Sequence, residues 1–224
     1  MASYPSTVAS TTRSSALTTN KVLRNTYLLL GATLAFSALT AGAAMVLNLA
    51  PINPWITLIV YFGLLFGVSK TENSSWGLLF IFLLTGFMGL TLGPIISMYL
   101  KFLPNGAQVV TTALGITAAT FVGLSAYAIR SQKDFSFMGG FLTVGIIGAF
   151  LLGLVAMIFQ LSTLSLVVSG VFVIAMAGLI LFQTSAIIHG GETNYIMATV
   201  TLYVSIYNLF TSLLHLLGAV SGDD

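Results

Sequence analysis

The chain has 224 residues, of which 57% are hydrophobic and 5% are charged, whereas an ordinary soluble domain carries about 25% charged residues. This composition excludes a typical soluble protein, because charged side chains would have to cover its outside, and it predicts an integral membrane protein. The net charge of +2 comes from scattered basic residues and there is no cysteine, which argues against a nucleic-acid surface, a disulfide framework and a cysteine metal site.

The first twenty residues, MASYPSTVASTTRSSALTTN, are rich in Ser and Thr and lack periodic apolar positions. This pattern predicts a disordered tail at residues 1–20. A transmembrane domain is expected over residues 21–220, followed by a short tail at residues 221–224.

Seven apolar runs are long enough, or nearly so, to cross a bilayer, which takes about 20 residues per helix. The fold class is therefore predicted to be all-α, with seven transmembrane helices. The second run is short and would extend through its Pro51 and Pro54 approach. The runs cover Tyr27–Leu49, Trp55–Val68, Trp76–Tyr99, Ala107–Ile129, Phe137–Phe159, Leu164–Ile188 and Tyr195–Val220.

The first run contains small residues on one helical face, Gly31, Ala35, Ala38 and Gly42. Such faces let membrane helices approach closely, so this face is expected to pack against a neighbour. The group Ala41-Gly42-Ala43 also resembles a signal-peptidase site, but the apolar run continues past it, which favours a packing surface.

Basic residues predict the orientation, because they concentrate in cytoplasmic loops. A cytoplasmic N-terminus places six of the seven Lys and Arg residues inside and leaves only Lys101 outside. The C-terminus would then be periplasmic. The six inside are Arg13, Lys21, Arg24, Lys70, Arg130 and Lys133.

The seventh run carries five polar residues at steps of four, three, four and three, which place them on one stripe. Because polar groups facing hydrocarbon are costly, this stripe is expected to face the bundle interior, with the seventh helix central. The side chains would either hydrogen-bond to neighbouring helices or line a conduction path, and the residues alone favour the first interpretation. The stripe consists of Thr201, Ser205, Asn208, Ser212 and His215.

Patterns typical of catalysis are missing from the sequence. No Asp, Glu, Lys or Arg lies within a predicted span apart from Lys101 at the end of the third, and there is no HExxH, GxSxG or P-loop motif. His189 and Glu192 are three residues apart in a glycine-containing stretch, which is typical of a solvated cytoplasmic turn rather than a metal site. The sequence therefore predicts neither an enzyme nor a cofactor.

Several stretches resemble the Bax inhibitor family of seven-helix membrane proteins over residues 21–217. The stretches are ALGITAATFVGLSAYAIRSQKDFSFMGGFL, KVLRNTYLLLGATLAFSALTAG, IIHGGETNYI and LYVSIYNLF. The resemblance is strongest to the bacterial YccA-like branch, which is known for inner-membrane partners and modulators of the membrane-anchored AAA+ protease FtsH. It implies a seventh helix surrounded by six others and an inner-membrane location.

The family is also described as containing pH-sensitive calcium leak channels, gated by a pair of Asp residues. Gln183 and Ser205 occupy those two positions here, and the second span lacks the basic residue that pairs with them. Neither Gln nor Ser titrates near neutral pH. The resemblance therefore implies an inhibitor of FtsH rather than a gated channel, which is kept as the alternative, and the candidate polar core comprises Gln183, Thr201, Ser205, Asn208 and Ser212.

Overall fold

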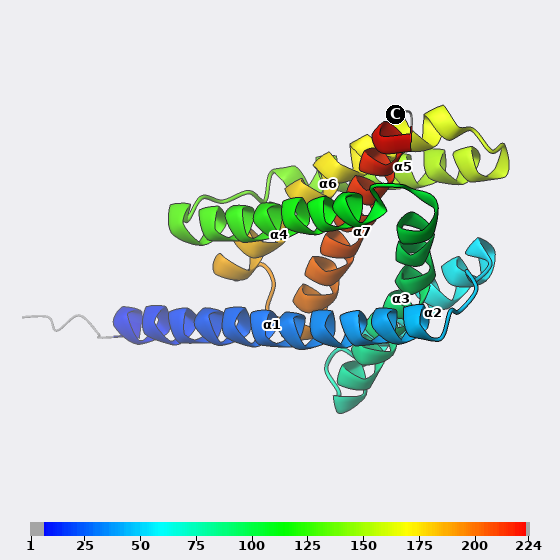
Figure 1. Ribbon diagram of the computed structural model, residues 1–224. Helices are drawn as coiled ribbons and strands as arrows, with labels where there is room; N and C mark the ends of the chain where they lie inside the picture. The colour runs from blue at the N-terminus through cyan, green and yellow to red at the C-terminus, as the bar shows by residue number, and fades with distance from the viewer. Residues whose placement is uncertain (1–6, 223–224) are drawn as a thin grey trace, which may run out of the picture.

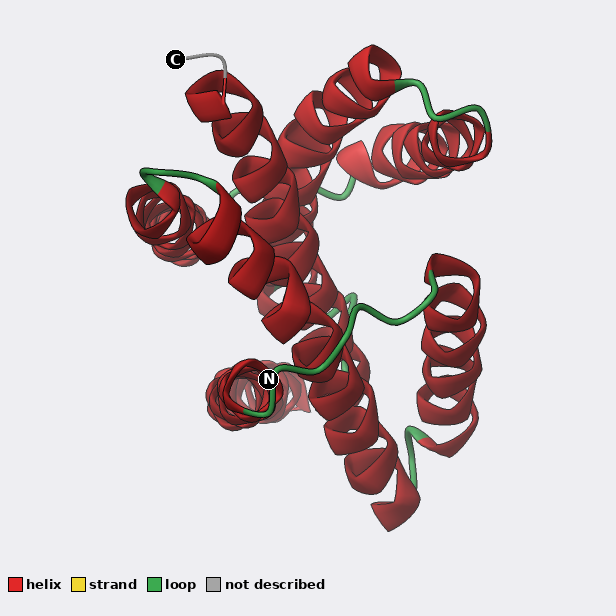
Figure 2. Cartoon of the chain, turned by 45° about the vertical axis from the view of Figure 1, so that its right-hand side comes forward, coloured by secondary structure: helices red, strands yellow, loops and turns green. Residues whose placement is uncertain are grey.

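Seven α-helices make up the computed structural model, which describes the backbone of residues 7–222 and the side chains from Lys21 onward (Figures 1 and 2). Within this part of the chain every helix is long and apolar enough to cross a membrane, and there is no strand. The predicted all-α fold with seven transmembrane helices is confirmed. The helices are α1 (Thr7–Val46), α2 (Pro54–Thr71), α3 (Ser75–Phe102), α4 (Gly106–Ser131), α5 (Met138–Ile158), α6 (Ser162–Ile188) and α7 (Tyr195–Gly222).

The second helix begins later than its apolar approach suggested. Asn53 is its N-cap and accepts a hydrogen bond from the Trp55 backbone N–H at 2.9 Å, and Pro54 occupies the first helical position. Proline suits that position because its missing N–H would have no partner there. Pro51 therefore lies in the preceding loop, and α2 gains its length at the other end, up to Thr71.

The boundaries of the two tails are not settled by the helices. Helix α1 continues back to Thr7, ahead of the apolar span that begins at Lys21. Helix α7 ends at Gly222, and residues 1–6 and 223–224 lie outside the described residues. The division into residues 1–20, 21–220 and 221–224 stays a prediction.

Helix α7 occupies the centre of the bundle. It packs against α1, α2, α3, α4 and α6, and Figure 1 shows it crossing between α1 and α4, which have no direct backbone contact. Half of the residues in its apolar window are buried, as in α3, against 6% in α2. Helix α5 is the exception in the surround, because its backbone approaches that of α6 alone.

The closest helix contact joins α1 to α3 through two glycines of α3. A Cβ atom on Gly89 would collide with the Ser37 carbonyl oxygen and the Thr40 hydroxyl, and one on Gly93 would lie 2.5 Å from the Ala41 carbonyl oxygen. The two backbones therefore touch along this line, as small residues permit in lipid.

The face of α1 that makes this contact is not the one that the small residues predicted. A Cβ atom on Gly31 or Gly42 would meet nothing within 4 Å, so neither glycine mediates close packing. The contact face instead carries Ser37, Ala41 and Ala44, all buried. The glycines that allow the approach belong to the partner helix, so the pattern within α1 could not locate it.

Candidate functional site

Three hydroxyl side chains of α7, spaced by four residues, connect the central helix to its neighbours. We call them the α7 hydroxyl row: Thr199, Tyr203 and Tyr207. Tyr203 is 1% exposed, and its hydroxyl donates to the Thr85 carbonyl oxygen at 3.2 Å and lies 2.7 Å from the Ser37 hydroxyl. One side chain thus joins α7 to both α1 and α3.

The other two members of the row act in the same way on either side of Tyr203. Thr199 Oγ1 shares its proton between the carbonyl oxygen of Tyr195, at 2.6 Å, and that of Thr26 on α1, at 3.3 Å. The Tyr207 hydroxyl lies 3.2 Å from the Thr91 hydroxyl on α3. The row therefore supplies a polar contact at three successive depths of the bundle.

The polar stripe predicted for α7 behaves differently. Ser205 and Ser212 are buried, whereas Thr201, Asn208 and His215 are half-buried. Ser205 Oγ donates to the Thr201 carbonyl oxygen at 2.7 Å, so it bonds within its own helix. Asn208 Nδ2 donates likewise to the Val204 carbonyl oxygen, at 2.8 Å.

Of the five stripe residues, only His215 has a hydrogen bond to another helix within the described part of the chain. Its Nδ1 lies 2.8 Å from the Ser169 hydroxyl on α6. The stripe therefore contributes little to holding the helices together, a role that the α7 hydroxyl row fills. The row escaped the sequence pattern because tyrosine counts as apolar in a hydropathy search, although its buried hydroxyl needs a partner.

Gln183 on α6 is buried, and its Nε2 has no hydrogen-bond partner among the described residues. The hydroxyls of Thr26 on α1 and Ser125 on α4 share this property. An unpaired buried polar group costs about 1 to 3 kcal/mol, so such groups usually mark an internal water or a functional position. Gln183 and Ser205 belong to helices that pack directly, but no hydrogen bond joins them within this part of the chain.

His189, the C-cap of α6, connects the α6–α7 turn to the α4–α5 loop. Its Nδ1 lies 2.9 Å from the Ser185 carbonyl oxygen, and its Nε2 lies 3.1 Å from the Gln132 carbonyl oxygen. The Ser185 hydroxyl also lies 3.3 Å from Nδ1, so both ring nitrogens have polar partners.

The same turn is also joined to the α2–α3 loop, through Asn194. Its Nδ2 donates to the Glu72 carbonyl oxygen at 3.2 Å and to Asn73 Oδ1 at 3.1 Å, and its Oδ1 caps α7 by accepting the Ile196 backbone N–H. Glu192 accepts the Asn194 backbone N–H at 2.8 Å. His189 and Glu192 therefore serve separate contacts, and do not face a common point.

These bonds gather three loops at one end of the bundle, which we call the three-loop end: α2–α3, α4–α5 and α6–α7. A polar cavity of about 440 Å³ lies there between residues 72–75 and 193–196. The Ser136 backbone N–H donates to the Asp134 carboxylate at 2.8 Å, and this bond lowers the pKa of Asp134. That this end faces the cytoplasm stays a prediction.

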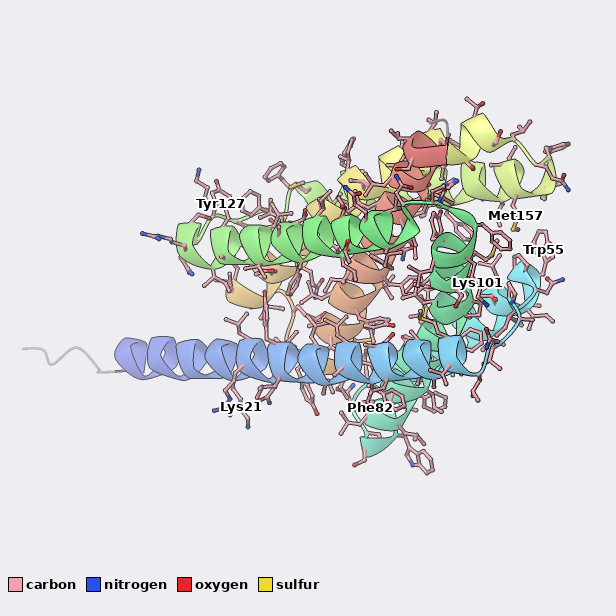
Figure 3. The ribbon with its side chains drawn as sticks, viewed as in Figure 1. Lys21, Trp55, Phe82, Lys101, Tyr127 and Met157 are labelled. Carbon is pink, nitrogen blue, oxygen red and sulfur yellow. The ribbon has the colours of Figure 1, made fainter. Side chains whose placement is uncertain are left out.

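The opposite end is marked by Lys101, whose Nζ donates to Asn48 Oδ1 at 2.9 Å. In Figure 3, Lys101, Trp55 and Met157 lie at one end of the molecule, and Lys21 and Tyr127 lie toward the other. Lys101 lies in the last turn of α3, and none of the described loops at its end of the molecule carries a charged side chain. The charge asymmetry that predicted the orientation is thus present in the folded molecule.

Comparison with known proteins gives extensive similarity. The family model described as "Inhibitor of apoptosis-promoting Bax1" matches residues 19–222. The chain is 52% identical over 212 residues to the Escherichia coli protein named "Modulator of FtsH protease YccA", covering 94% of this chain and 95% of the relative. A Pseudomonas aeruginosa protein is 54% identical over 203 residues, 91% of each chain, and a Vibrio cholerae membrane protein is 46% identical over 209 residues, 93% of each.

Proposed function

Because the chain belongs to the Bax inhibitor family, we propose that it is an inner-membrane protein that binds a membrane-anchored AAA+ protease of the FtsH type and lowers its activity on membrane substrates. The observation that carries the proposal is the 52% identity, over 94% of the chain, to a relative named as a modulator of that protease. Identity of this extent covers all seven helices, so the proposal concerns the whole bundle.

The three-loop end is the surface that we assign to the protease. Its loops are held together by the bonds of His189 and Asn194, so they present one connected polar surface rather than three independent loops. In the predicted orientation this surface faces the cytoplasm, where the catalytic part of an AAA+ protease works. The unpaired Gln183 and the non-titrating Ser205 give less support to a proton-gated leak.

Co-purification tests the proposal directly. The tagged protein, extracted in mild detergent from cells that make it naturally, is expected to bring the protease with it. Thr193→Glu places a charge on the exposed rim of the three-loop end and should weaken this recovery at least several-fold. Gln108→Glu, also exposed but at the opposite end, is the matched control because acidic residues barely affect membrane orientation.

Two results would contradict the proposal. If the protease is absent from the wild-type preparation, it is not the partner. If its recovery falls equally in both variants, the three-loop end is not the contact surface. A calcium-sensitive dye inside reconstituted vesicles tests the alternative, because a leak would give flux at acidic or neutral pH.

The N-terminal segment allows a second test of the same proposal. Its Ser- and Thr-rich composition, with Arg13 as the one charged side chain, suits a terminal segment that an AAA+ machine can grip, whereas the packed bundle resists extraction. Deletion of residues 2–19 should lengthen the lifetime of the protein in cells with active protease and leave it unchanged in cells without. Equal lifetimes of the full-length and shortened chains in the first strain would argue against this role.

A further inference from the structure

A crevice opens between α2 and α5 and reaches inward to the central helix. Two adjoining cavities, of about 430 and 400 Å³, share Thr57, Leu58, Thr91, Phe150, Phe172 and Tyr207 in their walls, and together form what we call the α2–α5 crevice. The two flanking helices have no backbone contact with each other, and the ring of Phe62 meets that of Phe150 edge to face at 5.7 Å. Figure 2 shows α2 and α5 standing apart.

The crevice is open toward the lipid rather than toward water. Phe62 and Ile147, which line its inner part, are 48% and 55% exposed and belong to membrane-spanning helices. The walls are mostly apolar, so ordered water would find few partners in it. An empty crevice would also forfeit the dispersion contacts of its walls. A hydrocarbon chain in the crevice would match the apolar walls and restore their dispersion contacts.

The length of the crevice matches one leaflet of a bilayer. Its outer end lies beside Pro54 and Met157, and its inner end lies beside Ile146 and Asn208. Figure 3 shows Met157 at the Lys101 end of the molecule. From Ile146 to Met157, α5 rises about 16 Å at 1.5 Å per residue. This is about half of the 30 Å hydrocarbon core.

The volume of the two cavities distinguishes between a lipid chain and a helix as the occupant of the crevice. A helix about 10 Å wide with a 5.4 Å pitch fills about 420 Å³ in one turn, so either cavity would hold only about one turn of a partner helix or of a second copy. A slender chain can instead follow the full length. We propose that the α2–α5 crevice is a binding site for one acyl chain of a phospholipid from the leaflet at the Lys101 end.

This site lies apart from the three-loop end and does not depend on the proposed protease partner. The acyl chain enters beside Pro54 and Met157 and runs along α5 toward the midplane. It covers the side of Tyr207 and Asn208 that the helices leave open. The bound lipid thereby separates the polar residues of α7 from the bulk membrane.

Gly153 offers a way to fill the crevice without disturbing the helices. It lines the outer part, and a Cβ atom there would meet only Val168 Cγ1, at an ordinary 3.6 Å. Gly153→Phe therefore places a ring where the acyl chain would lie. Gly148→Phe is the matched control, because Gly148 is on the same helix, outside the crevice walls, with nothing within 4 Å of its Cβ position.

Native mass spectrometry can detect a phospholipid that stays bound to the protein. After reconstitution with a 3:1 mixture of phosphatidylethanolamine and phosphatidylglycerol and extraction in mild detergent, the wild type and Gly148→Phe should each retain one phospholipid. In Gly153→Phe the lipid-bound fraction should fall at least ten-fold. Equal retention by the two variants, or no retained lipid in the wild type, would overturn the site.

A second measurement covers the case in which Gly153→Phe does not fold. A photoreactive phenylalanine analogue replaces Phe150, and irradiation of the detergent-purified protein should give an adduct with the mass of a phospholipid. The same analogue in place of Phe141, which is 78% exposed on α5, should give none, because bulk lipid has been washed away. A cross-link from position 150 to a polypeptide, either a second copy or another protein, would refute the lipid assignment.

Discussion

Replacing Tyr203 by Phe tests whether the α7 hydroxyl row holds the bundle together. The substitution removes one oxygen and keeps the ring, so packing around this 1% exposed side chain is preserved. Two contacts disappear, the 3.2 Å hydrogen bond to the Thr85 carbonyl oxygen and the 2.7 Å bond with the Ser37 hydroxyl. Both are between helices, so their loss acts on association rather than on helix formation.

The expected magnitude follows from values for membrane helices. Hydrogen bonds between such helices contribute about 0.6 kcal/mol each on average, so the two contacts of Tyr203 come to about 1.2 kcal/mol. In a protein of 150 to 250 residues, 1 kcal/mol shifts Tm by about 2 to 4 °C. We therefore expect Tyr203→Phe to lower Tm in detergent by about 2 to 5 °C.

The assay is thermal unfolding in one detergent, followed by loss of the monodisperse peak. Tyr127→Phe is the control, because Tyr127 is 47% exposed on α4 and its hydroxyl has no hydrogen bond among the described residues. A double-mutant cycle with Ser37→Ala should give a coupling energy of about 0.6 kcal/mol. If Tyr203→Phe unfolds at the same temperature as Tyr127→Phe, the row does not carry the stability assigned to it.

Two further outcomes follow from other contacts. Gly89→Ala should lower the free energy of unfolding by about 1 to 3 kcal/mol, because its Cβ would collide with the α1 backbone. Gly115→Ala is the control and should not lower it, because there is open space around Gly115 on α4. Equal melting temperatures of the two variants would refute this prediction. The pKa of Asp134 is lowered by the Ser136 N–H, so this bond is intact at neutral pH and is lost as the pH falls through that lowered pKa. The protection of the Ser136 amide, measured against its intrinsic exchange rate, should fall there, but not in Asp134→Asn.

Composition and run length were enough to predict seven spanning helices, because the bilayer imposes both on any helix that crosses it. The central position of α7 also followed from its polar residues. The contacts themselves did not, because they depend on pairs of helices. Gly89 and Ser37 are close only when α3 lies against α1, and nothing within either stretch encodes the partner.

The side-chain contacts of the candidate site were also not predictable from the sequence pattern. Steps of three and four selected Ser205 and Asn208, whose short side chains return to their own backbone in the structure. Tyr203 and Tyr207 reach other helices because a ring separates the hydroxyl from the backbone. A search that treated tyrosine as a hydrogen-bonding residue would have found Thr199, Tyr203 and Tyr207 at a regular step of four.

The central place of α7 has a consequence for synthesis. The ribosome delivers this helix after the other six, at about 5 to 20 residues per second, and α1 and α4 have no backbone contact of their own to hold them together before it arrives. Until then Ser37 and the Thr85 carbonyl lack the tyrosine hydroxyl that bonds to both. Insertion of α7 is therefore the step that closes the bundle, and a chain stopped before Tyr195 would leave an open, polar-lined ring of helices for membrane quality control to remove.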